Sequence, residues 1–110
     1  MKRIITFSTI FCFSLILSSC NKEPLITEEY SIMQVYIEGQ IVLETENKEN
    51  IGEVIKKINT ESRETTHEMS LPDPIGKIVF KNNKQNLTAY LYGSGNVTVD
   101  VYIVDTGFEF

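Results

Sequence analysis

The chain is poor in the residue types that carry most enzyme chemistry. Its 110 residues include no tryptophan, one histidine and two cysteines. His67 lies in a polar stretch without a nucleophile at a recognisable spacing, and the carboxylates form no calcium-binding pattern. Cys12 and Cys20 both lie near the N-terminus, so the rest of the chain has no thiol for catalysis or metal binding. We therefore predict a protein that is not an enzyme and that needs no metal and no cofactor.

Basic residues are also scarce. Lysine and arginine total 10 against 15 acidic residues, which gives a net charge of −5. Proteins bind nucleic acids through clustered lysine and arginine, so this composition argues against a nucleic-acid partner. An acidic surface would suit a basic protein partner, but the same charge also favours solubility alone.

An uncharged apolar run follows directly after a basic start. Met1-Lys2-Arg3 precedes residues 4–17, which contain no charge. This length matches the apolar region of a secretory signal and falls short of the ~20 residues that a membrane-spanning helix needs. We predict that residues 1–19 are a signal peptide, with an uncleaved membrane anchor as the alternative.

The sequence Leu17-Ser18-Ser19-Cys20 closes this run and resembles the lipobox of bacterial lipoproteins. The resemblance implies cleavage between Ser19 and Cys20 and acylation of Cys20, with palmitate-like chains. Two or three such chains anchor a protein stably, so the expected partner is the membrane itself. Loss of Lys2 and Arg3 with the signal would leave eight basic residues against 15 acidic ones, a net charge of −7.

The residues after the lipobox bear on the location. Asn21-Lys22-Glu23 is similar to signals that direct lipoproteins to the cell surface in the Bacteroidetes group, and it lacks the aspartate that retains lipoproteins at the inner membrane of enteric bacteria. We expect a lipid-anchored protein of the cell envelope, in the outer membrane, facing either the periplasm or the surface. Residues 20–29 would be the lipidated cysteine and a tether, and residues 30–110 one small domain.

The first half of this domain predicts a strand followed by a helix. Apolar residues alternate over residues 30–43, with Gly39 as a bulge or kink. Asn50 with Glu53 fits a helix N-cap with its capping-box partner. An apolar stripe then recurs at helical spacing, at Ile51, Val54, Ile55 and Ile58. Residues 61–75 form a long polar connection, which favours a disordered loop over a functional one.

The second half predicts three strands, at residues 77–81, 86–92 and 97–104. A hairpin turn at residues 93–96 joins the last two. In the last strand, the inward positions would be Val97, Val99, Val101 and Ile103. The predicted fold class is therefore α+β, in the order β-α-β-β-β, with one helix packed on a four-stranded, mostly antiparallel sheet.

One short motif invites a catalytic interpretation. Asp105-Thr106-Gly107 resembles the signature of aspartic proteases, in which two such carboxylates share a proton. Only three residues follow it, so the rest of that fold has no room after the motif. We interpret it as the end of a strand.

The best candidate surface is aromatic. Tyr90, Tyr92 and Tyr102 share the predicted outward parity of two paired strands, and Tyr36 joins them from the first strand. Tyrosine gives a large contact area at low entropic cost, so these rings could bind a protein or a glycan. Tyrosine is also common in strands for conformational reasons alone.

Two functions are consistent with these features. The first is a membrane-anchored, non-catalytic binding or accessory module that uses the tyrosine face. The alternative is an inhibitor or immunity-type lipoprotein, whose acidic domain blocks a basic hydrolase. The sequence names no specific partner for either function.

Overall fold

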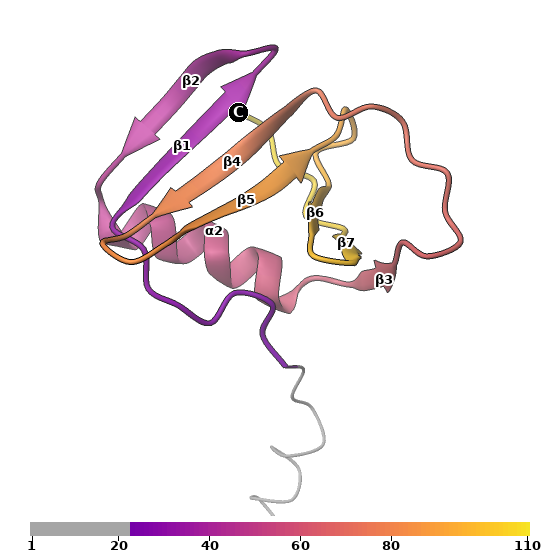
Figure 1. The fold of residues 1–110 in the computed structure, drawn as a ribbon, viewed down its shortest axis with the longest axis horizontal. Helices are drawn as coiled ribbons and strands as arrows, with labels where there is room; N and C mark the ends of the chain where they lie inside the picture. Colours follow the sequence, from indigo (N-terminus) through magenta and orange to yellow (C-terminus); the bar gives the residue numbers. More distant parts are fainter. Residues whose placement is uncertain (1–22) are drawn as a thin grey trace, which may run out of the picture.

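The computed structural model describes residues 23–110. These residues form an antiparallel sheet with one helix packed on its face (Figure 1). Over those residues the sheet has seven strands in the order β2-β1-β4-β5-β6-β7-β3. The elements are β1 Ile32–Ile37, β2 Gln40–Thr45, α2 Lys48–Thr60, β3 Arg63–Thr65, β4 Gly76–Lys81, β5 Asn86–Leu91, β6 Val97–Val99 and β7 Tyr102–Val104. The predicted α+β character, a mostly antiparallel sheet with one helix, is confirmed. The predicted four strands are wrong.

The predicted signal peptide and Cys20 lie outside the described residues. Within residues 23–110, no helix combines the length and the apolar character needed to cross a bilayer.

The first extra strand arises because residues 30–43 form a hairpin and not one strand. Glu38 and Gly39 have φ angles of 51° and 82°, and two consecutive residues at positive φ make the tight turn that suits antiparallel strands. The predicted kink at Gly39 is therefore a chain reversal. The bulge lies in β2, because Val35 pairs with Leu43 and Tyr36 with Ile41, which leaves Val42 without a partner.

Residues 97–104 also form a hairpin. Asp100, with φ 57°, and Val101 connect β6 to β7, so that Val99 pairs with Tyr102 and Thr98 with Ile103. Val101 is consequently exposed, and Ile103 lies on the same face as Thr98. The predicted inward positions at Val101 and Ile103 are therefore wrong, because the reversal exchanges the faces of all later residues.

The third extra strand lies in the predicted disordered connection. Residues Arg63–Thr65 form β3, which pairs with β7 and makes the second edge of the sheet. The polar composition of residues 61–75 hid this strand, since it has no apolar alternation.

The helix begins before the predicted N-cap. Asn47 is the cap residue, and its Oδ1 accepts hydrogen bonds from the backbone N–H groups of Glu49 and Asn50 at 2.9 and 3.1 Å. Asn50 is therefore inside the first turn. The predicted stripe is confirmed, since Ile51 and Ile58 are buried and Val54 and Ile55 pack against the core.

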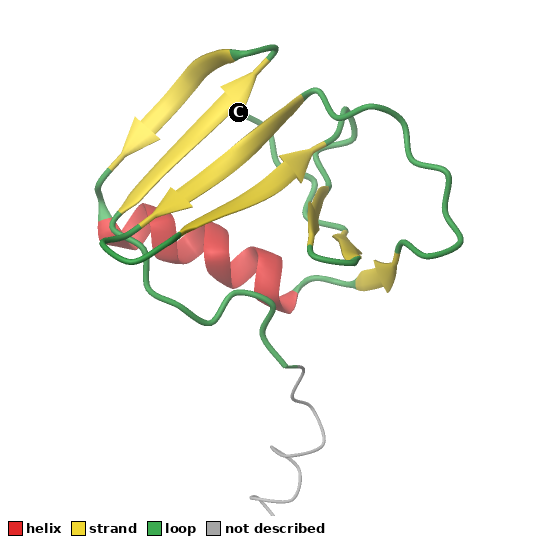
Figure 2. Cartoon of the chain, viewed as in Figure 1, coloured by secondary structure: helices red, strands yellow, loops and turns green. Residues whose placement is uncertain are grey.

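The core lies between α2 and the facing side of β1, β4 and β5, where the helix covers the sheet (Figure 2). Alternate residues of these strands point into it. The largest fully buried side chains in the described part are Phe80, Met33, Ile51, Ile58, Ile78, Val35, Val97 and Val104. Two terminal segments add to this core. Leu25 and Ile26 pack against it from the N-terminal side, and Phe108 packs against it from the C-terminal side.

Candidate functional site

The face of the sheet opposite α2 carries a line of side chains across four neighbouring strands. Tyr36 on β1 pairs with Lys77 on β4, and Lys77 pairs with Tyr90 on β5. Ile41 on β2 pairs with Tyr36 and continues the line to the sheet edge. Tyr36, Lys77 and Tyr90 neighbour buried residues along their strands, so they point away from the core, and Ile41 shares their face through its pairing with Tyr36. We call Ile41, Tyr36, Lys77 and Tyr90 the open-face row.

The open-face row is accessible. Tyr90 is 48% exposed and Ile41 is 50% exposed. Figure 2 shows no helix or loop in front of β2, β1, β4 and β5 on this side. Ile41 and Tyr90 are among the most exposed large apolar side chains of residues 23–110, so this face is the candidate interaction surface.

Contacts within the row fix the position of Tyr36. The Lys77 Nζ lies 5.1 Å from the centroid of the Tyr36 ring, a cation–π distance. The Tyr36 hydroxyl donates a hydrogen bond to Gln34 Oε1 at 3.3 Å, and Gln34 Nε2 donates to Glu44. Tyr36 is therefore held along its own strand, whereas no such contact with Tyr90 is found among the described side chains.

Two of the four predicted tyrosines lie elsewhere. Tyr92 has the outward parity of Tyr90 but is only 9% exposed, with its hydroxyl 3.5 Å from Thr98 Oγ1. Tyr102 pairs with the buried Val99 and so belongs to the core-facing side, and the guanidinium of Arg63 lies 5.1 Å from its ring centroid. The structure brings Tyr36 and Tyr90 to one row and leaves Tyr92 and Tyr102 outside it.

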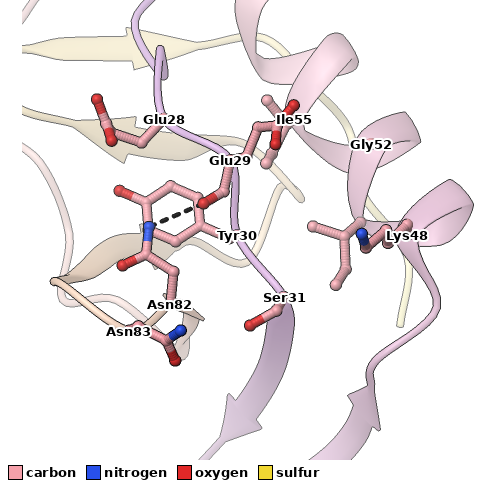
Figure 3. Close-up of a pocket in the computed structure, with 10 residues that line it drawn as sticks. Glu28, Glu29, Tyr30, Ser31, Lys48, Gly52, Ile55, Asn82 and Asn83 are labelled. Atoms are coloured by element: carbon pink, nitrogen blue, oxygen red, sulfur yellow. Dashed lines mark hydrogen bonds between the residues drawn. The ribbon is translucent and has the colours of Figure 1, made fainter.

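A cavity of about 460 Å³ lies between the N-terminal segment, the first turns of α2 and the β4–β5 turn (Figure 3). Its buried lining residues are Tyr30 and Ile51, and its charged lining residues are exposed. The lining residues are Glu28, Glu29, Tyr30, Ser31, Lys48, Ile51, Gly52, Ile55, Asn82 and Asn83.

Two hydrogen bonds hold this cavity together. Asn82 Nδ2 donates to the Glu29 carbonyl at 2.8 Å, and Gln85 Nε2 donates to the Tyr30 hydroxyl at 3.0 Å. In Figure 3 the carboxylate of Glu29 points toward Ile55, while that of Glu28 points away from the helix. Sequence reasoning missed the cavity because three distant segments build it. The only signal was the pair of acids in a segment that we interpreted as a tether.

The residues that suggested catalysis have other positions. Thr106 is buried and its Oγ1 donates to the Gly95 carbonyl at 2.9 Å, while the Asp105 N–H donates to the Ser62 carbonyl at 2.8 Å. The protease-like motif thus attaches the C-terminal segment to the β5–β6 turn and to the residue before β3. His67 is exposed, and residues 23–110 contain no group of three histidine, cysteine, aspartate or glutamate side chains that could hold a metal.

Comparisons of this chain with protein families, curated proteins and solved structures gave no match. No relative therefore assigns a role to the open-face row or to the cavity. The function proposed below rests on the side chains themselves.

Proposed function

We propose that this chain is a lipid-anchored, non-catalytic binding module of the cell envelope, placed in the outer membrane by Cys20. The open-face row is the observation that carries the proposal. It presents two tyrosines, a lysine and an isoleucine on four hydrogen-bonded strands. The lipobox-like sequence supports the anchor, and the partner is a protein or a glycan.

The physical character of the row suits recognition. Antiparallel strands hold its side chains at fixed spacing, so little backbone entropy is lost when a partner binds. Tyrosine offers both an apolar ring and a hydroxyl, which suits a protein surface as well as the faces and hydroxyls of sugars. Lys77 adds a positive charge at the centre of the row, in a chain that is acidic overall.

Site-specific photo-crosslinking in living cells tests this proposal. A benzophenone-bearing phenylalanine would replace Tyr90, and the matched control would carry it at Glu53, an exposed position of α2. We expect a discrete adduct from position 90 and none from position 53, and mass spectrometry would tell a protein adduct from a glycan. Adding Tyr36→Ser should lower the yield severalfold. Equal labelling at both positions, or none at position 90, would contradict the proposal.

The cavity favours the second candidate, an inhibitor of a basic hydrolase. Glu28 and Glu29 lie at its rim, where a lysine or arginine side chain of an enzyme could enter. Glu28→Gln combined with Glu29→Gln should then weaken inhibition of a lysozyme-like hydrolase. Raising the ionic strength from about 0.1 M to 1 M should do the same, because the screening length falls from ~10 to 3 Å. Inhibition that is absent, or unaffected by both changes, would exclude this candidate.

A further inference from the structure

The N-terminal segment is fastened to the end of the helix. Asn59 Oδ1 accepts a hydrogen bond from the Ile26 N–H at 2.9 Å, and Asn59 Nδ2 donates to the Ile26 carbonyl at 3.0 Å. One amide side chain thus satisfies both backbone groups of Ile26, whose side chain is 5% exposed. Arg63 Nη2 adds a hydrogen bond to the Glu23 carbonyl at 2.7 Å. The described part of the predicted tether is therefore packed and hydrogen-bonded.

This fastening sets the length of any link to a lipid on Cys20. Three residue steps separate Cys20 from Glu23, and a fully extended chain spans at most ~3.6 Å per residue, or about 11 Å in total. If the chain were free as far as Tyr30, ten steps would give about 36 Å. The contacts of Glu23 and Ile26 thus shorten the reach about threefold.

We propose that the fastened segment holds the folded domain directly against the bilayer. The end that contains Glu23, the last turn of α2 and β3 faces the lipid headgroups. The β1–β2 turn lies at the opposite end of the molecule (Figure 1). In the proposed orientation this turn points away from the membrane. The inference rests on the proposed lipid anchor and deepens it, since it assigns the bilayer a particular surface of the domain.

The proposed orientation places the open-face row close to the membrane. The row lies on the sheet face opposite α2, between the end near the bilayer and the distal end. In the proposed orientation its side chains therefore point sideways, roughly parallel to the membrane. A partner must therefore approach within a short distance of the membrane, which favours one that is itself membrane-bound over one in free solution. A long tether would impose no such restriction.

Fluorescence quenching on vesicles tests the orientation. The full lipidated protein would be placed in phosphatidylethanolamine–phosphatidylglycerol vesicles whose headgroups carry a short-range nitroxide quencher. The sequence has no cysteine beyond Cys20, so a single introduced cysteine can be labelled. Ser62→Cys reports on the end near the bilayer and Gln40→Cys on the distal end, and both positions are exposed. We expect severalfold stronger quenching at position 62.

Insertions then test the length of the link. Eight Gly/Ser residues between Lys22 and Glu23 add a mean span of about 16 Å and should remove most of the difference between the two positions. The same eight residues between Pro72 and Asp73 are the matched control and should leave the difference intact. Asn59→Ala, which releases Ile26, should reduce the difference without abolishing folding.

The outcomes separate the inference from the function on which it rests. Mass spectrometry of the purified protein first determines whether Cys20 is the acylated first residue. An intact N-terminus would overturn both the lipid anchor and the inference. An acylated Cys20 with equal quenching at positions 40 and 62, or with no effect of the Lys22–Glu23 insertion, would overturn the inference alone.

Discussion

The two halves of the sheet are stabilised in different ways. In one half, β2, β1, β4 and β5 each have six residues, and α2 covers one face of the last three. In the other, β6, β7 and β3 have three residues each. Backbone groups of Gly95, Ser62 and Val101 bind the adjoining segments there. Side chains are buried in both halves, as Val97 and Val104 show for the short strands. The comparison shows that the short strands depend in addition on turns and backbone hydrogen bonds with the adjoining segments.

Removing a central side chain of the long-strand half should have the largest effect. Phe80 on β4 is fully buried, and its ring centroid lies 5.8 Å from that of Tyr30. Phe80→Ala should lower the free energy of unfolding by about 3–5 kcal/mol, because it removes apolar contacts and leaves a cavity. Urea denaturation measures this. Phe110→Ala, at a ring that is 44% exposed, is the control and should cost less than about 1 kcal/mol.

A backbone change should break the short-strand half. Gly95 has φ 89°, and a Cβ there would collide with the Phe108 carbonyl oxygen and the Gly107 carbonyl carbon. Gly95→Ala should lower the free energy of unfolding by about 2 kcal/mol or more, because strain and a steric clash act together. Gly93, in the same turn, has open space around its Cα. If Gly93→Ala were as costly as Gly95→Ala, backbone geometry would not be the cause.

The helix that supports the long strands allows a finer test. Asn47→Ala should cost about 1 kcal/mol of unfolding free energy, since two N–H groups of the first turn lose their acceptor. Asn50→Ala should change stability by under about 0.5 kcal/mol, because Asn50 is inside the helix and alanine is a good helix former. Thermal denaturation compares the two. A larger loss for Asn50→Ala would place the cap where the sequence pattern put it.

The smallest effect on stability should come from the open-face row. Tyr90→Ser should cost less than about 1 kcal/mol, because the ring is half exposed and strand propensities differ by only about that amount. Binding of the partner should nevertheless fall at least tenfold if Tyr90 is a central contact. Circular dichroism and the crosslinking yield measure the two quantities. A large stability loss would instead make Tyr90 a structural residue.

Sequence patterns predicted the elements in which a regular apolar pattern continues over several residues. The stripe from Ile51 to Ile58 gave the helix, and the alternations around Ile78 and Ala89 gave β4 and β5. They failed at the two added hairpins, because Glu38 and Asp100–Val101 are not the asparagine–glycine pairs that usually mark such turns. The missed turn at Asp100–Val101 exchanged the faces of the later residues, which is why Tyr102 was assigned to the wrong side. After the first missed turn, the bulge at Val42 restored the predicted face, because Leu43 pairs with Val35.

By itself, the sequence determined the class of the fold and the helix with its buried stripe, because these depend on local period and composition. The tertiary structure decided which tyrosines share a face, since strand pairing and not chain order sets neighbours across a sheet. It also decided that residues around Ile26 are fastened, because their partner, Asn59, lies 33 positions along the chain. Such long-range contacts leave no periodic trace in the sequence.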